Sequence, residues 1–328
     1  MTPEERAQKV LAGDVRAVAR LMRDIDDGQP GWREVLSLLH PHAGKARIIG
    51  LTGSPGVGKS TLTDVLVERY RAQGKTVGVV AVDPTSPFSG GAILGDRIRM
   101  QRHATDEGVF IRSLATRGHF GGLTASARGV VTVMEAMGRD VVLVETVGVG
   151  QDEVEIVRMA DTTVIVTVPG LGDDIQAIKA GILEAGDIFV VNKMDRGGVG
   201  RTVQELRNML ALSGGHERRA GWEPPVLTTS ALDGRGVDEL MEALDGHHRV
   251  LEAEGGERLR QRRREGLRRE MLDLIQSGIM ERLMARLEQG QGMDPLVERV
   301  LSGGEDPYTV SDEVIKNALS GQPPGQGE

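Results

Sequence analysis

Residues 53–61 read GSPGVGKST, a complete phosphate-binding loop pattern. The pattern follows a strand-like run at 48–51 and opens a predicted helix from Ser60 to Gln73, which is the setting such a loop needs. Glycines let backbone N–H groups wrap phosphates, lysine neutralises terminal phosphates, and serine can bind Mg²⁺. The predicted phosphate-binding residues are Gly53, Ser54, Pro55, Gly56, Val57, Gly58, Lys59, Ser60 and Thr61, with Lys59 also catalytic.

A second motif, Asn-Lys-Met-Asp at 192–195, is predicted to select the base of the bound nucleotide. It follows the apolar run 188–191, and ligands of doubly wound folds bind beyond the carboxyl ends of such strands. The Asp195 carboxylate can accept hydrogen bonds from both N1 and the exocyclic amine of guanine, whereas adenine offers no such pair of donors. The nucleotide is therefore predicted to be GTP. The predicted guanine-site residues are Asn192, Lys193, Asp195, Ser230, Ala231 and Leu232.

Two acidic residues follow strand-like runs, Asp83 after 77–82 and Glu145 after 141–144. Alone, each would more often cap the following segment. Beside a phosphate loop, carboxylates at strand ends are placed to hold Mg²⁺ and to orient an attacking water, so both are predicted to be catalytic. The segment Glu-Thr-Val-Gly at 145–148 matches the usual Asp-x-x-Gly motif, whose glycine N–H can sense the γ-phosphate, except that glutamate replaces aspartate. The predicted metal-site residues are Ser60, Asp83, Asp96 and Glu145.

Two loops, 84–100 and 170–174, are longer and more charged than simple connections require, and loops of this kind usually move or bind. They and the following segment contain the candidate switch residues Arg99, Asp173 and Lys179. The histidine pairs at 40/42 and 247/248 lack the carboxylate or cysteine neighbours of a metal site and are interpreted as surface residues.

Strand-length apolar runs alternate with helical segments between residues 46 and 250, which predicts an α/β fold with a doubly wound, mostly parallel sheet. The runs are 48–51, 77–82, 109–111, 141–144, 164–168, 188–191 and 226–229. A helical extension is predicted over 1–45, beginning with a capping box at Thr2 and Glu5.

Residues 251–319 form a predicted carboxy-terminal helical arm, and 320–328 a disordered tail. The arginines and glutamates of 252–270 are interpreted as a solvated helix face. The apolar stripe from Met271 to Leu287 is expected to pack either on the sheet domain or on a second copy of itself.

The composition excludes several classes of protein. The chain has 328 residues, a net charge of -8, 2% aromatic residues and no cysteine, which argues against nucleic acid as a partner and against thiolate metal sites. No apolar run approaches the ~20 residues of a membrane span. The first residues lack the features of a signal or transit peptide, so no membrane partner and a cytoplasmic location are expected.

The chain resembles the methylmalonyl-CoA mutase-associated GTPases (the MeaB/MMAA family), which belong to the dimer-forming branch of P-loop GTPases. The resemblance lies in GSPGVGKST at 53–61, VDPTSPFSGGAILGDRIRM at 82–100, ETVGVGQDE at 145–153, PGLGDDIQAIKAGI at 169–182 and NKMDR at 192–196. It implies a slow GTPase that acts as a chaperone for an adenosylcobalamin-dependent mutase, gating cofactor delivery and protecting or rescuing that enzyme.

The resemblance also implies roles for individual residues. Lys59 and Ser60 are expected on phosphate and Mg²⁺, Asp83 and Glu145 near the metal and water, and Asp195 on guanine. Arg99, Asp173 and Lys179 are expected in switch loops, and the carboxy-terminal helices are expected to form a homodimer arm.

Alternatives remain open from the sequence. A metal-delivery GTPase for nickel enzymes would need cysteine or clustered histidine, which this chain lacks. A P-loop kinase is a further alternative, against which the guanine motif argues. Methylmalonyl-CoA mutase is the expected client, with isobutyryl-CoA and ethylmalonyl-CoA mutases as alternatives. Gln151 lies three residues after Gly148 and is not assigned as the water-positioning residue.

Overall fold

The computed structural model describes residues 1–84, 101–103, 105–116, 122–146, 159–170, 185–212, 221–289 and 292–320. The chain divides into two compact units, Met1–Arg268 and Arg269–Glu328. The predicted metal residue Asp96 and the predicted switch residues Arg99, Asp173 and Lys179 lie outside the described residues, as do Gly148 and Gln151.

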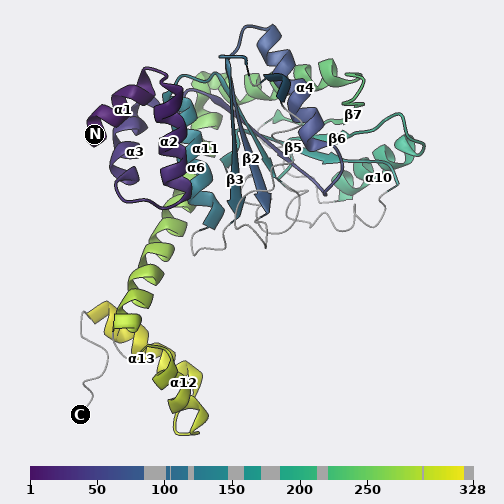
Figure 1. Ribbon diagram of the computed structural model, residues 1–328. Helices are drawn as coiled ribbons and strands as arrows, with labels where there is room; N and C mark the ends of the chain where they lie inside the picture. Colours follow the sequence, from purple (N-terminus) through teal and green to yellow (C-terminus); the bar gives the residue numbers. More distant parts are fainter. Residues whose placement is uncertain are drawn as a thin grey trace. The chain divides into compact units, whose positions relative to one another are not determined.

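The first unit contains a seven-stranded sheet in the order β3-β2-β4-β1-β5-β6-β7 (Figure 1). Every neighbouring pair is parallel, so the predicted doubly wound parallel α/β fold is confirmed. The strands are β1 (Arg47–Thr52), β2 (Val77–Pro84), β3 (Val109–Thr116), β4 (Val141–Thr146), β5 (Thr162–Thr167), β6 (Ile188–Val191) and β7 (Val226–Thr228).

The central strand β1 pairs with β4 on one side and β5 on the other, so the strand order reverses beside it. In open α/β sheets, ligands bind outside the carboxyl ends of the strands at such a switch point. In each of the six-residue strands β1, β4 and β5, every residue is buried, as expected for strands covered on both faces. The topology therefore places a ligand site at the loop that leaves β1.

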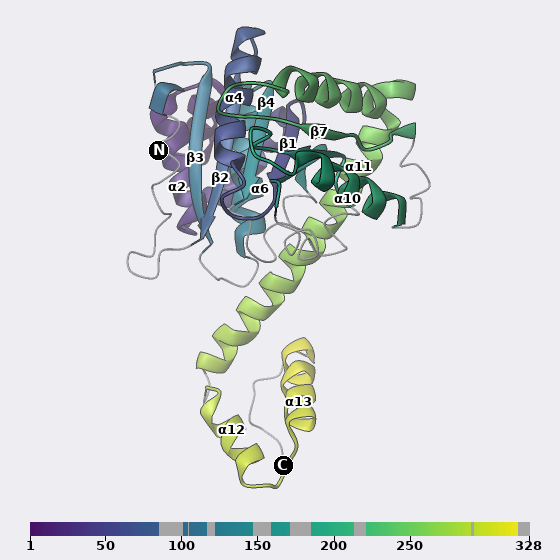
Figure 2. The ribbon, with the colours of Figure 1, turned by 90° about the vertical axis from the view of Figure 1, so that its right-hand side faces the viewer.

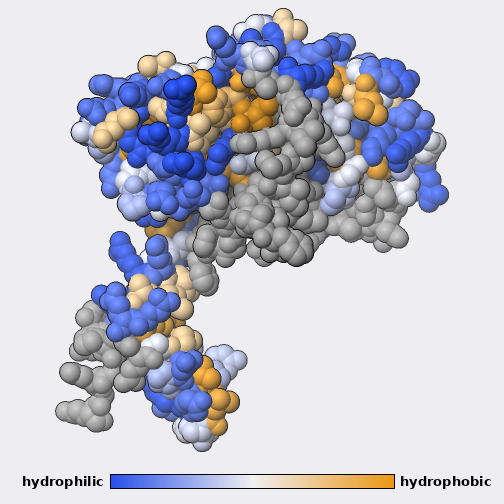
Figure 3. Space-filling model, viewed as in Figure 1, coloured by the Kyte–Doolittle hydropathy of each residue, from blue (hydrophilic) through white to orange (hydrophobic). Residues whose placement is uncertain are grey.

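The N-terminal helices cover one face of the sheet. They are α1 (Pro3–Leu11), α2 (Val15–Asp26) and α3 (Trp32–Leu39), and they share one hydrophobic core with α6 (Gly122–Ala136) and with strand residues such as Val80 and Val142. The predicted capping box is present, since the Thr2 hydroxyl accepts from the Glu5 N–H at 3.2 Å and the Glu5 carboxylate accepts from the Thr2 N–H at 3.1 Å. The outer surface of these helices is mostly hydrophilic (Figure 3).

The opposite face is covered by α4 (Lys59–Ala72) and the first part of α11 (Val237–Gln289), as Figure 2 shows. Helix α10 (Val199–Leu212) packs beside β6 and β7. Helix α4 begins one residue earlier than predicted. Short 3₁₀ turns occupy His40–His42 and Gln101–His103.

Helix α11 contains a kink, because Ala253 to Gly256 have non-helical backbone angles and Glu254 has a φ of 56°. Beyond the kink, Arg262 forms an ion pair with Asp187 at 2.7 Å, and Arg263 forms one with Asp161 at 2.7 Å. The interpretation of this segment as a solvated face is therefore wrong at these two arginines. Its other arginines include Arg260, which is largely exposed.

The amino edge of the sheet, where the parallel strands begin, thus holds buried charge. Asp161 and Asp187 precede β5 and β6 and are only 1% and 2% exposed. His247 is also buried, bonded to the Thr162 hydroxyl at 2.9 Å and with its ring centroid 5.1 Å from that of Trp222. The interpretation of His247 as a surface residue is wrong, because a sequence gives no sign of which helix face meets the sheet.

The second unit contains the end of α11 together with α12 (Asp294–Leu301) and α13 (Pro307–Ser320). Arg299 joins these two short helices, since it pairs with Glu305 at 2.5 Å and with Glu313 at 2.6 Å. Among the described residues, no helix has both the length and the apolar character needed to cross a bilayer.

Candidate active site at the carboxyl edge of the sheet

The phosphate loop joins β1 to α4, and its glycines are required by close packing. Gly53 and Gly58 have φ values of 139° and 98°, in the region that favours glycine. A Cβ at Gly53 would lie 2.0 Å from the Val166 carbonyl oxygen, and one at Gly58 would lie 2.5 Å from the Asn192 amide nitrogen. Any side chain at these two positions would push the loop away from β5 and from the guanine motif.

Lys59 lies across the loop. Its ammonium group donates to the carbonyl oxygen of Gly53 at 2.6 Å and to that of Ser54 at 2.9 Å. Helix α4 begins at this residue, and its N-cap, Gly58, supplies no side-chain hydrogen bond. A helix N-terminus without a side-chain cap, beside a lysine and a glycine loop, is suited to binding phosphate groups.

Glu145 lies at the end of β4, only 3% exposed, and faces the first turn of α4. Its carboxylate accepts from the Ser60 hydroxyl at 2.6 Å and from the Thr63 hydroxyl at 3.0 Å. The structure therefore brings the predicted pair Ser60 and Glu145 into direct contact. Thr63 was missed by sequence reasoning, although a hydroxyl one helical turn after Ser60 lies on the same face of α4.

These side chains fit a magnesium ion by their chemistry. A hydroxyl and a carboxylate supply the hard oxygen ligands that Mg²⁺ prefers, and Ser60, while donating to Glu145, keeps its oxygen lone pairs. Asp83 lies in β2 one residue beyond Val82, which pairs with Thr146 of β4, so its backbone lies at the same edge. The Asp83 side chain lies outside the described part of the chain. Among the described residues, no group of three or more histidines and carboxylates is arranged so that it could hold a metal ion.

Asn192 connects the phosphate loop to the guanine motif. Its amide nitrogen donates to the Val57 carbonyl at 2.9 Å, and its amide oxygen accepts from the Thr229 hydroxyl at 3.0 Å and the Ala231 N–H at 3.1 Å. The side chain is 2% exposed. Asn192 therefore holds three loops together, a role that its place in the motif did not reveal.

Lys193 and Asp195, the other predicted guanine-site residues of this motif, differ in their contacts. Lys193 has a φ of 58° and donates to the Gly56 carbonyl at 2.7 Å, so its aliphatic stem lies beside the phosphate loop. Asp195 is exposed and forms no hydrogen bond or ion pair with another described residue. Its carboxylate is available to a ligand, as the prediction of guanine binding requires.

The loop after β7 contains the remaining predicted guanine-site residues, Ser230, Ala231 and Leu232. The Ser230 hydroxyl donates to Asp233 at 2.7 Å, and the Ser230 backbone bonds to Arg235 at 2.9 Å. The hydrogen bond from Ser230 and then that from Arg235 lower the pKa of Asp233. Ala231 is buried, whereas Leu232 is 85% exposed. Of the predicted residues, Ser230 and Ala231 thus anchor the loop, and Leu232 lies at its exposed tip.

A parallel sheet with a phosphate loop at its switch point and an Asn-Lys-x-Asp motif beside it defines the class of P-loop GTPases. The chain belongs to the MeaB family, since the family model for the methylmalonyl Co-A mutase-associated GTPase MeaB matches residues 16–288. It is a GTPase that binds GTP and GDP.

Individual relatives agree with this assignment. A provisionally named GTPase of Pyrococcus abyssi is 46% identical over 97% of both chains. GTPase ArgK of Escherichia coli is 39% identical over 77% of this chain and 78% of its own length. A mouse protein named methylmalonic aciduria type A homolog, mitochondrial, is 35% identical over 82% of this chain and 64% of its own.

A solved structure has a similar fold. The crystal structure titled LAO/AO transport system kinase matches with a TM-score of 0.70 and 29% identity, over 96% of each chain.

Proposed function

We propose that this GTPase acts in the cytoplasm as a chaperone for an adenosylcobalamin-dependent acyl-CoA mutase, with methylmalonyl-CoA mutase as the expected client. It would gate delivery of the cofactor and protect or reactivate the mutase. The observation that carries the proposal is the match of residues 16–288 to a family described as mutase-associated. The mouse relative, named for methylmalonic aciduria, supports the same client.

The site geometry supports nucleotide-dependent control. Ser60, Thr63 and Glu145 form one hydrogen-bonded group between α4 and β4. We propose that Mg²⁺ binds at Ser60, with Asp83 and Glu145 close by, where it would neutralise charge on the terminal phosphates. Lys59 would contact the same phosphates, and the predicted sensor segment at 145–148 begins with the last two residues of β4, Glu145 and Thr146.

A homodimer arm is also part of the proposal. The apolar stripe of α11 is solvent-exposed in the isolated chain, with Met271 at 54%, Ile275 at 53% and Ile279 at 53% exposure. These residues recur at every fourth position and so share one helix face. A second copy of the chain would bury this face. Light scattering should give twice the monomer mass, and Ile275→Glu with Ile279→Glu should give the monomer.

The central experiment measures GTP hydrolysis by the chain with and without a purified adenosylcobalamin-dependent mutase. We expect the mutase to raise the rate with GTP, and the Lys59→Ala chain to show no such increase. A parallel assay follows recovery of an inactivated mutase on addition of GTP, cofactor and chain. If methylmalonyl-CoA, isobutyryl-CoA and ethylmalonyl-CoA mutases all leave GTP turnover unchanged, the chaperone role is refuted and the GTPase assignment remains.

A kinase is the second candidate, since the solved structure at 29% identity carries a transport-system kinase title. It predicts a phosphorylated protein acceptor when labelled nucleotide is added to a cell extract. The chaperone proposal predicts labelled inorganic phosphate alone.

A further inference from the structure

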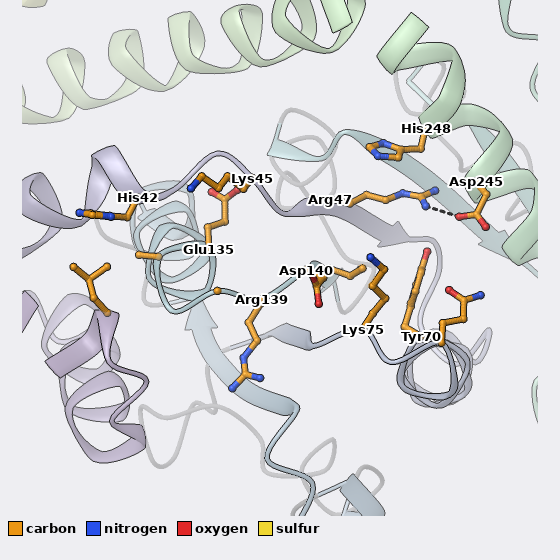
Figure 4. Close-up of a pocket in the computed structure, with 15 residues that line it drawn as sticks. His42, Lys45, Arg47, Tyr70, Lys75, Glu135, Arg139, Asp140, Asp245 and His248 are labelled. Carbon is orange, nitrogen blue, oxygen red and sulfur yellow. Dashed lines mark hydrogen bonds and ion pairs between the residues drawn. The ribbon is translucent and has the colours of Figure 1, made fainter. Parts of the chain in front are cut away.

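A groove of about 760 Å³ lies at the amino edge of the sheet, where β1 and β4 begin. Figure 4 shows the residues that line this groove. It is bounded by the start of β1 at Arg47, the end of α4 at Tyr70, and the segment between α6 and β4 that contains Arg139. Asp245 and His248 of α11 complete the wall. This volume falls within the range of small-molecule sites.

Several polar atoms on the groove residues have no protein partner. Arg47 is 8% exposed and donates from Nη1 to Asp245 at 2.7 Å, but its Nε and Nη2 are buried without a hydrogen bond. The same holds for the Tyr70 hydroxyl, in a residue that is 2% exposed, and for His248 Nδ1. Buried polar groups of native proteins nearly always have a partner, so these atoms indicate one that the chain itself does not provide.

The unused capacity is mainly for donating hydrogen bonds. Asp245 Oδ1 accepts from Arg47, and Asp140 Oδ2 accepts from the Thr76 N–H at 2.7 Å and the Thr76 hydroxyl at 2.9 Å. Glu135 has one unpartnered oxygen, and burial raises the pKa of this carboxyl, which favours its uncharged form. One oxygen each of Asp245 and Asp140 is therefore already engaged, whereas the hydrogen bonds from Thr76 lower the pKa of Asp140 and keep it charged.

The basic groups are less engaged. Lys45 and Lys75 line the groove, and neither ammonium group donates a hydrogen bond to another described residue. Figure 4 shows the Tyr70 hydroxyl and the Lys75 ammonium group pointing toward the Arg47 guanidinium. Burial raises the pKa of Tyr70 to about 12, so its hydroxyl remains a donor at neutral pH.

We propose that this groove is a second ligand site, which binds a small molecule through a phosphate group held by Arg47, Tyr70 and Lys75. A guanidinium edge with two free N–H groups matches the oxygens of a phosphate. The additional donors from Tyr70 and Lys75 suit its third oxygen, which a carboxylate lacks. The apolar side chains of Leu11, Ala136 and Val141 line the same groove and would contact the remainder of the ligand.

The chain offers a direct probe, because Tyr70 and Tyr308 are its only tyrosines. The chain labelled with 3-fluorotyrosine should give two ¹⁹F signals, which Tyr308→Phe assigns. With the nucleotide site saturated by GDP and Mg²⁺, inorganic phosphate should shift the Tyr70 signal saturably. Tyr308, which is 83% exposed, should not respond. Sodium chloride at matched ionic strength and acetate are the comparison titrants, and both should give a much smaller shift.

Lys75→Gln removes one exposed cation of the groove, leaves Arg47 and Tyr70 in place, and should raise the dissociation constant about tenfold. The matched control is Lys316→Gln, an exposed lysine in the second unit, which should bind phosphate like the unaltered chain. A Tyr70 signal that responds equally to phosphate and chloride would overturn the proposal and leave water as the partner of these atoms. Equal affinity in Lys75→Gln would overturn it too. Neither result would change the proposal that the chain is a chaperone for a mutase.

Discussion

At the carboxyl edge of the sheet, Lys59 donates to two loop carbonyls and Asp195 stays exposed, whereas at the amino edge Asp161 and Asp187 are buried and each is held by an arginine of α11. At the first edge the polar side chains, several of them buried, gather around the phosphate loop and the motif at 192–195. The second uses charge to fix a helix against the strands. Substitution of Lys59 or Asp195 should therefore change activity more than stability, and substitution of the α11 arginines that hold Asp161 and Asp187 should change stability more than activity.

The largest effect is expected from Arg262→Met. This change leaves the Asp187 carboxylate, which is 2% exposed, without the arginine that now pairs with it. Removing one partner of a buried ion pair costs about 3–5 kcal/mol. The free energy of unfolding in urea should fall by this amount, while the folded protein hydrolyses GTP at nearly the original rate.

The matched control is Arg260→Met on the same helix. Arg260 and its partner Glu257 are 64% and 68% exposed, so the loss should stay within about 1 kcal/mol. Equal losses in the two variants would remove the distinction between buried and exposed charge in α11.

Lys59→Ala should show the opposite behaviour at the carboxyl edge. Loss of a preorganised cation at a phosphate site lowers catalysis by about 10²–10³-fold. Single-turnover GTP hydrolysis measures this effect, and the urea midpoint should change little. A variant that hydrolyses GTP normally would refute the assigned role of Lys59.

His247 should make stability depend on pH. Burial, and then the nearby cations Arg262, Arg47 and His248, lower its pKa to about 4, although Asp187 acts in the opposite direction. The folded state therefore favours the neutral ring. Its stabilising contribution is complete above the ordinary pKa of about 6.5, and up to about 3 kcal/mol is lost as the pH falls from there to about 4.

Unfolding free energies measured between pH 4 and 8 test this expectation. In His247→Asn, whose amide can still reach the Thr162 hydroxyl, the slope between pH 6.5 and 4 should be shallower. An unchanged slope would assign the pH dependence to other groups.

The smallest effect is expected from Asp195→Asn. The asparagine amide can accept only one of the two guanine hydrogen bonds, so the preference for GTP over xanthosine triphosphate should fall by about 10- to 100-fold. Nucleotide competition measures the change. Because Asp195 is exposed, the unfolding free energy should stay constant.

Most of the fold and the centre of the site could be predicted from the sequence. The phosphate loop is contiguous, and its glycines, lysine and serine occupy fixed places between a strand and a helix, so the pattern carries its own geometry. Apolar runs separated by helices likewise predicted the parallel sheet. The exposure of Asp195 at a strand end agrees with its motif, and its guanine-binding role stays a prediction.

The sequence alone determined the class of nucleotide-binding protein and the order of its elements, through local patterns in which neighbours in the chain act together. Only the tertiary structure decided that Asn192 bonds to Val57, that Thr63 bonds to Glu145, and that Arg262 meets Asp187. These pairs lie far apart in the chain, and burial decides their roles. Charged and amide side chains become structural when folding removes them from water and supplies a partner, and no local pattern reports which ones will be removed.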